Sequence, residues 1–305
     1  MHLMMDRRLK SRSREFNGIR EVEHSFCDIQ KTKLVYIMQK EYATVNPSLV
    51  DAVGTDGLST CVGLIIRNPK NRKISVAHID IPNIVEAGLG QMLSSISDQD
   101  SNASYDVHLI GGYKDISYEH KRWRQGVSLT LCSKIIEVLF KSPAKFNIQT
   151  LHVLDHNTQY DREKNAYRIF EGFIVKTDTG SILPARFHET TKGPAIILRE
   201  ARRSLCVIDS NWKNRLLYTY DTDSDRYIIA PISWDETAIE GPKQLLGLSD
   251  EDFAKVYYYS PPLQIDHDYI RYLKSIVEYI VKNPNSEMVF PNRKPRAFMR
   301  IPNGE

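Results

Sequence analysis

Two residues in the first third of the sequence are of types that do nucleophilic chemistry together. Cys61 precedes one apolar run and His78 lies in the next, with the turn signal Asn-Pro-Lys-Asn between them at residues 68–71. If those four residues form a hairpin loop, Cys61 and His78 pair directly across two strands, with Cβ atoms about 4.5–5.5 Å apart. An imidazolium at that distance favours the thiolate, which is the nucleophilic form of cysteine. The pattern is consistent with amide hydrolysis and also with two side chains that only pack together.

The loop upstream of Cys61 carries groups that such a pair requires. Glycines at positions 54 and 57 allow backbone N–H groups to converge on an oxyanion. Thr55 and Ser59 have hydroxyls that can orient an imidazole, the role of the third member of a triad. A single β-bulge would turn Cys61 to the opposite face from His78, so the sequence alone leaves this geometry open.

The elements that must position these residues are mixed in type. Apolar alternation predicts strands, and a 3.6-residue period predicts helices at 84–93, 127–140 and 266–282. The predicted strands are 34–42, 62–67, 73–80, 107–110, 146–154, 167–176, 182–187, 216–220 and 227–232. Because strands and helices do not alternate regularly, the prediction is an α+β sandwich of mixed, largely antiparallel sheets.

The N-terminal 30 residues differ from the rest. Five basic residues fall within positions 7–14, and no apolar signal region follows them. We expect residues 1–30 to form a disordered basic arm and residues 31–295 to form a single domain.

Composition limits the partners and the compartment. The net charge is only +3, and no apolar run approaches the roughly 20 residues of a membrane span. The cation–aromatic run Lys-Arg-Trp-Arg at 121–124 is too short to predict a nucleic-acid site. The four cysteines are widely spaced and form no Cys-x-x-Cys pair, which is typical of a reduced compartment. We therefore expect a monomer in the cytoplasm or nucleus that binds neither membrane nor nucleic acid.

Short motifs around the pair point to a known family. They are Tyr-Ile-Met-Gln-Lys-Glu at 36–41, Gly-Thr-Asp at 54–56, Ser-Thr-Cys at 59–61, Ala-His-Ile-Asp at 77–80 and Val-His-Leu-Ile-Gly-Gly-Tyr at 107–113. This set resembles the eukaryotic protein N-terminal asparagine amidohydrolases, and Glu-Tyr-Ala-Thr-Val at 41–45 resembles their plant branch. The likeness covers roughly residues 34–290 and is patchy after residue 183.

A more distant likeness concerns the triad. Bacterial chemoreceptor glutamine deamidases carry a threonine, a cysteine six residues later and a histidine seventeen residues after that. Thr55, Cys61 and His78 have the same spacing. The resemblance implies that these three residues form a catalytic triad within a layered α/β/β sandwich.

The resemblance also implies a reaction. It is hydrolysis of the side-chain amide of an N-terminal asparagine through a Cys61 thioester, giving aspartate and ammonia without a metal or cofactor. In the family the product feeds an arginylation-dependent, N-degron degradation route. Two alternatives remain open: deamidation of internal glutamine or asparagine on a protein, and an inactive interaction module with the same fold.

A substrate with a free N-terminus requires a partner for its α-ammonium group. Asp80 is two residues from His78 and therefore on the same strand face, which makes it the first candidate. Glu41 and Asp56 are the other carboxylates, and Ser59 and Thr60 are expected to line the substrate site. Asp80 is equally consistent with a carboxylate that ends a strand and faces water.

Overall fold

The computed structural model describes residues 2–24, 32–97, 103–115, 126–257 and 266–300. Contacts divide the chain into two compact units, of which the first is Met1–Pro194, Asn214–Ile228 and Phe298–Glu305, and the second is Ala195–Lys213 and Ile229–Ala297. The single domain expected over residues 31–295 stays a prediction. Cys27 and the basic run at 121–124 lie outside the described residues.

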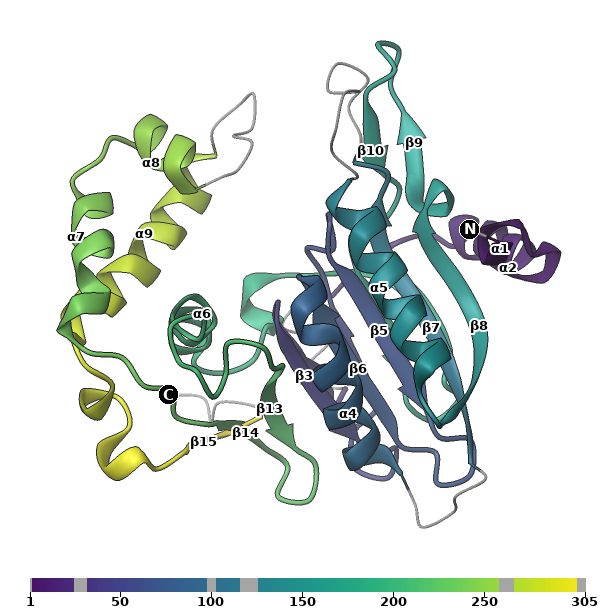
Figure 1. The fold of residues 1–305 in the computed structure, drawn as a ribbon, viewed down its shortest axis with the longest axis horizontal. Helices are drawn as coiled ribbons and strands as arrows, with labels where there is room; N and C mark the ends of the chain where they lie inside the picture. Colours follow the sequence, from purple (N-terminus) through teal and green to yellow (C-terminus); the bar gives the residue numbers. More distant parts are fainter. Residues whose placement is uncertain (1, 25–31, 98–102, 116–125, 258–265, 301–305) are drawn as a thin grey trace. The chain divides into compact units, whose positions relative to one another are not determined.

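The strands form a large sheet, a smaller sheet and a separate hairpin (Figure 1). The large sheet has the order β15-β14-β13-β3-β6-β5-β7-β8. Its strands are β3 Glu41–Val45, β5 Val62–Arg67, β6 Ile74–Ile79, β7 Ser104–Tyr113, β8 Lys145–Leu154, β13 Leu217–Asp221, β14 Arg226–Ile229 and β15 Arg296–Met299. The five-stranded sheet consists, in spatial order, of β1 Val22–His24, β12 Ile182–Phe187, β11 Phe173–Lys176, β4 Ala52–Thr55 and β2 Leu34–Tyr36. The hairpin pairs β9 Thr158–Tyr160 with β10 Ala166–Arg168.

Helices occur in both units. In the first unit they are α1 His2–Met5, α2 Arg7–Asn17, α4 Val85–Ile96 and α5 Val127–Lys141, with single 3-10 turns η1 Pro82–Ile84, η3 Asp155–Asn157 and η4 Glu189–Thr191. In the second unit they are α6 Ile196–Leu205, α7 Glu240–Leu246, α8 Asp250–Tyr257 and α9 His267–Lys282, with 3-10 turns η5 Glu236–Ile239, η6 Ser286–Met288 and η7 Pro291–Arg293. Within the described ranges, no helix has both the length and the apolar character that a membrane crossing requires.

The central strands β5 and β6 of the large sheet are buried on both faces, and successive side chains of each strand point to opposite sides. Val62, Leu64 and Ile66 of β5 lie in a core with α4 and α5, which cover this face (Figure 1). Ile65 of β5 lies in a second core together with Phe173 of the five-stranded sheet. The order helix, sheet, sheet is the layered α+β sandwich that the sequence predicts.

Residues 2–5 and 7–17 of the N-terminal arm are helical where the sequence predicts disorder. Asp6 caps α2 by accepting hydrogen bonds from two backbone N–H groups of its first turn. Leu9, Ser13 and Phe16 are spaced along one face of this helix and are buried, and α2 contacts β8. Two apolar residues among many basic ones gave too weak a periodic signal for the sequence to predict this helix.

The strand predicted at 34–42 is interrupted. It forms β2 in the five-stranded sheet and β3 in the large sheet. Lys40, between them, has a φ of 68°, in the left-handed region that ends a strand. The chain therefore crosses from one sheet to the other at this turn.

In the second unit, α9 is the predicted C-terminal helix. Its buried residues, all on one stripe, are Ile270, Leu273, Ile276, Val277 and Ile280. By contrast, α6 was not predicted, because its apolar pattern is interrupted by arginines. Two of these, Arg199 and Arg202, are themselves buried.

Candidate active site

The candidate site lies where the chain crosses twice between the two sheets. Residues 37–40 join β2 to β3, and residues 56–61 join β4 to β5. The second crossing ends at Cys61, which immediately precedes β5. Residues from both sheets therefore meet at this place.

Thr55 and His78 come together from different sheets. Thr55 is the last residue of β4, and His78 is the fifth residue of β6. Thr55 Oγ1 lies 2.8 Å from His78 Nδ1, which is hydrogen-bond distance. Both side chains are buried, at 0% and 2% exposure. The contact fixes the orientation of the imidazole ring, as the third member of a triad does.

The close approach of the sheets here depends on Gly63, which pairs with His78 across the hairpin. A Cβ atom on Gly63 would lie 2.2 Å from the ring of Phe173. Phe173 in turn pairs with Thr55. The missing side chain at position 63 therefore lets Phe173 pack beside the Thr55–His78 contact.

The predicted register of the Cys61–His78 hairpin is wrong by two residues, because the strand partner of His78 is Gly63. The loop closes through Asn68 and Lys73, since Asn68 N donates to Lys73 O at 3.0 Å. Val62 consequently pairs with Ile79, and His78 faces Gly63 instead of Cys61. The parity of the strands is unchanged, so Cys61 keeps the same face as His78. It becomes a diagonal neighbour, roughly 7 Å away and still within reach of an imidazole.

The end of β7 holds the backbone of Cys61. Gly112 N donates to Cys61 O at 2.8 Å. Gly111 and Gly112 have φ values of 110° and 47°, in the region that favours glycine. A Cβ atom on Gly111 would lie 2.7 Å from Cys61 O. The two glycines therefore allow β7 to approach the Cys61 backbone closely.

Asp80 lies next to Cys61 in this register. One step beyond the last pair, Val62 with Ile79, the strand partner of Cys61 is Asp80. Gln39 Nε2 donates to Asp80 Oδ2 at 3.1 Å. The other carboxylate oxygen, Oδ1, is buried and has no hydrogen-bond partner among the described residues. A buried acceptor left in this state costs about 1–3 kcal/mol, which is unusual for a purely structural carboxylate.

The other two candidate carboxylates are engaged in internal hydrogen bonds. Glu41 accepts from Met38 N at 2.9 Å and from Thr219 Oγ1 at 3.0 Å. Asp56 accepts from Tyr36 Oη at 2.7 Å and from Phe187 N at 2.8 Å. Burial raises the pKa of the Asp56 carboxyl above its ordinary value. Both carboxylates thus hold the two crossings in place.

Ser59 and Thr60 are half-buried in the second crossing. Ser59 N donates to Gly57 O at 2.9 Å, and Leu58 N donates to Glu171 O at 2.7 Å. These two N–H groups are therefore used to shape the loop. The backbone oxyanion site expected over residues 54–60 does not include them.

Comparison with known proteins identifies the family of the chain. Residues 25–305 match the model of a family described as protein N-terminal asparagine amidohydrolase. A protein of that name from Arabidopsis thaliana is 42% identical over 303 residues, which covers 96% of this chain and 87% of the relative. The chain belongs to the protein N-terminal asparagine amidohydrolase family. Members from Sus scrofa and Homo sapiens are 25% and 22% identical, and each match covers 89% of this chain and 82% of the relative.

Five residues shape this candidate site in ways that the sequence did not predict: Gln39, Gly63, Phe173, Gly111 and Gly112. Gln39 gave no signal, because its hydrogen bond to Asp80 depends on the fold. Gly63 and Phe173 gave none either, since they lie on different sheets. The doublet Gly111-Gly112 was the one visible signal, because consecutive glycines at a strand end often mark a close backbone approach.

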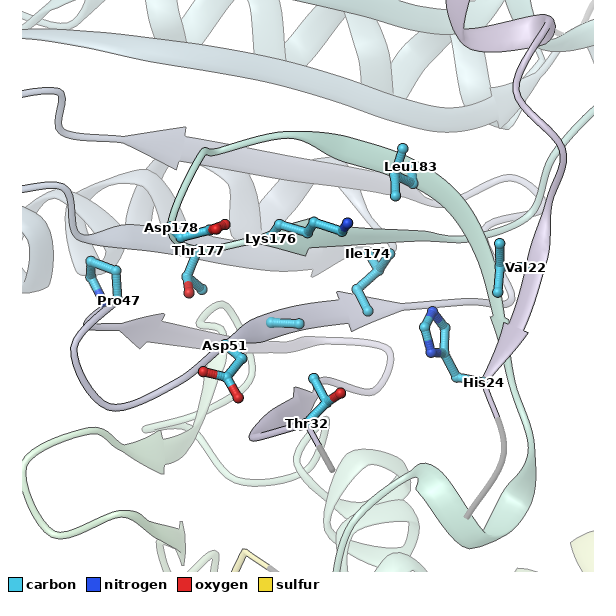
Figure 2. A pocket seen from close by; sticks show the side chains of 11 residues that line it. Val22, His24, Thr32, Pro47, Asp51, Ile174, Lys176, Thr177, Asp178 and Leu183 are labelled. Atoms are coloured by element: carbon cyan, nitrogen blue, oxygen red, sulfur yellow. The ribbon is translucent and has the colours of Figure 1, made fainter. Parts of the chain in front are cut away.

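A separate pocket of about 500 Å³ lies on the five-stranded sheet. Figure 2 shows Ile174 between His24 on one side and Asp51 on the other. None of its lining residues belongs to the Cys61 site. The pocket is therefore not the place where the predicted triad would act.

Proposed function

We propose that this enzyme hydrolyses the side-chain amide of an N-terminal asparagine, with Cys61 as nucleophile, His78 as acid and base, and Thr55 as the orienting residue. Membership of the amidohydrolase family supports the reaction class. The observation that carries the assignment of residues is the 2.8 Å contact between Thr55 Oγ1 and His78 Nδ1 on the face that Cys61 shares.

The proposed first half-reaction forms a thioester. Because Thr55 contacts Nδ1 of His78, Nε2 is the nitrogen that exchanges protons with the Cys61 thiol. His78 takes that proton, and the thiolate attacks the carboxamide carbon of the substrate. The C–N bond then breaks as the imidazolium gives its proton to the departing ammonia.

The second half-reaction consumes water. His78 removes a proton from a water molecule, and the resulting hydroxide attacks the thioester carbon. The C–S bond breaks, the thiolate recovers its proton from His78, and the peptide leaves with an N-terminal aspartate. The balance is one water consumed and one ammonia released, with no redox step and no cofactor.

Recognition of the free N-terminus is assigned to Asp80. Its buried Oδ1, which has no partner among the described residues, is suited to a substrate ammonium group, since a charge-assisted hydrogen bond is stronger than a neutral one. This favours the anchor over a strand-end carboxylate that faces water. Because the strand register sets Asp80 opposite Cys61, a fixed ammonium group also fixes how far the carboxamide reaches. That favours asparagine over glutamine. The extra methylene of glutamine alone would allow a discrimination of only about 1–3 kcal/mol.

We also propose a cellular role and a compartment for the enzyme. An N-terminal aspartate is the kind of product that an arginylation-dependent N-degron route would consume, so we place the enzyme upstream of such a route. The reduced cysteines expected from the sequence favour the cytoplasm or nucleus, and we propose that it acts there as a monomer.

Ammonia release from three matched peptides tests the proposal. We expect turnover of a peptide that begins with asparagine, and little or none of the same peptide beginning with glutamine or acetyl-asparagine. Turnover of the acetylated peptide would instead indicate a deamidase of internal residues. No ammonia from any peptide, together with an ordinary thiol pKa from alkylation rates, would indicate an inactive interaction module.

A further inference from the structure

Several buried hydrogen bonds hold the turn between β2 and β3 in one conformation. The buried carboxylate of Glu41 accepts from Met38 N at 2.9 Å, while Glu41 N donates to Met38 O at 3.0 Å. The second oxygen of Glu41 accepts from Thr219 Oγ1 at 3.0 Å. A buried acid is thus used to hold the turn in one conformation, because charge-assisted hydrogen bonds are the stronger kind.

The same turn is attached to the strand that carries His78. Lys40 N donates to His78 O at 2.8 Å, and Lys40 O accepts from Leu217 N at 2.9 Å. The position of the turn is therefore fixed relative to β6. Asp80, two residues beyond His78, lies within reach of the tip of the turn.

Gln39, at that tip, donates from Nε2 to Asp80 Oδ2 at 3.1 Å. This leaves Oδ1 of Asp80 as the buried oxygen without a partner among the described residues. The chemistry of the donor matters here. A neutral amide orients the carboxylate and leaves its negative charge intact, whereas a lysine or arginine would neutralise it and compete with an incoming ammonium group.

We propose that Gln39 is a positioning residue that presents Asp80 Oδ1 to the α-ammonium group of the substrate. This inference rests on the proposed function, and specifically on Asp80 as the ammonium anchor. Glu41, which the sequence suggested as an anchor itself, takes part by holding the turn that carries Gln39. The site thus uses one carboxylate to bind and another to position.

Steady-state kinetics of Gln39→Met on an asparagine-initiated peptide tests this role. The change keeps the length of the side chain and removes the N–H donor, so KM should rise about 10-fold or more while kcat changes by less than about 3-fold. Gln39→Ala should show the same changes in KM and kcat. If one of the two variants fails to fold, the other still tests the role. Gln149→Met is the matched control, because Gln149 Nε2 makes a similar 2.8 Å bond to Asp106 Oδ1 at the far end of the sheet.

A double-mutant cycle with Asp80→Asn separates positioning from structure. If Gln39 acts through Asp80, then Gln39→Met should add little to the KM of the Asp80→Asn variant. Additive effects, or an unchanged KM in both Gln39 variants, would overturn the inference while leaving the activity established. A wild-type enzyme that releases no ammonia from the peptide would instead overturn the proposed function and the inference together.

Discussion

Two histidines of the large sheet make nearly the same contact, yet they have different surroundings. His78 Nδ1 lies 2.8 Å from Thr55 Oγ1, and His152 Nδ1 lies 2.8 Å from Ser13 Oγ. Both rings are buried. A hydroxyl beside an imidazole is therefore not enough to identify a catalytic centre.

The difference lies in what surrounds the second ring nitrogen. His152 Nε2 is 3.1 Å from Asn157 Oδ1, and the ring packs 4.9 Å from Phe16 and 6.0 Å from Phe170, measured between centroids. Ser13 and Phe16 belong to α2, so their contacts with His152 attach this helix to the sheet. His78, in contrast, shares its face with Cys61 and Asp80, at the end of the sandwich where both crossings lie. We therefore expect His78 to act in proton transfer and His152 to contribute to stability.

The largest effect is expected from the same substitution at each histidine. His78→Asn should lower the rate of ammonia release by about 10³-fold, because the general acid and base is lost. His152→Asn should leave the rate within about 3-fold and lower the Tm instead. Peptide turnover and thermal unfolding of both variants check this, and equal losses of activity would remove the distinction.

We expect the pH dependence of stability to come from two histidines outside the candidate site, His152 and His108. Burial lowers the pKa of His152 to about 4, and that of His108 likewise. The unfolded chain takes up these protons near pH 6.5 and the folded chain does not, so stability is full above about pH 6.5 and is lost as pH falls towards 4.

Each histidine should therefore reduce the free energy of unfolding by about 2 kcal/mol between pH 7 and pH 5. Urea titrations at the two pH values measure this loss. His152→Asn should show a smaller loss than the wild type, and an identical loss would contradict the assignment.

The two hydroxyls provide the next test. Thr55→Val should lower kcat about 10- to 100-fold, since a hydrogen bond to a group that becomes charged is worth about 1.5–3 kcal/mol. Ser13→Ala should leave kcat unchanged and lower the free energy of unfolding by about 1–3 kcal/mol, because a buried ring nitrogen loses its partner. A stability loss without a kcat loss in Thr55→Val would make Thr55 structural too.

The smallest effect concerns the packing beside His78. Gly63→Ala should lower the free energy of unfolding by about 1–3 kcal/mol, because its Cβ atom would lie 2.2 Å from the Phe173 ring. Gly90→Ala, in α4, is the control. An added Cβ there meets nothing within 4 Å, and alanine should stabilise the helix by up to about 1 kcal/mol. Denaturant midpoints compare the two, and equal shifts would show that position 63 tolerates a side chain.

Much of the fold around the site was predictable because it depends on local patterns. The apolar runs gave β5 at its observed bounds, and the helical period predicted α9 to within one residue of its observed bounds. The layered order of helices and two sheets also agrees with the structure. These features follow from side-chain periodicity, which the sequence records directly.

What was missed depends on details that periodicity does not record. The hairpin register changed because Asn68 N bonds Lys73 O, which brings Asp80 opposite Cys61. The contact between Thr55 and His78 joins two sheets, and the role proposed for Gln39 depends on a turn with a left-handed residue. The helix α2 was missed because its buried face holds only two apolar residues and a serine.

The most direct test of the central claim is ammonia release from an asparagine-initiated peptide by Cys61→Ala. The substitution removes the nucleophile and leaves the buried surroundings of Thr55 and His78 in place, so the variant should keep the wild-type Tm within a few degrees. The account predicts that its ammonia release falls to the background rate of the peptide alone. A folded Cys61→Ala protein that still releases ammonia at the wild-type rate would contradict it.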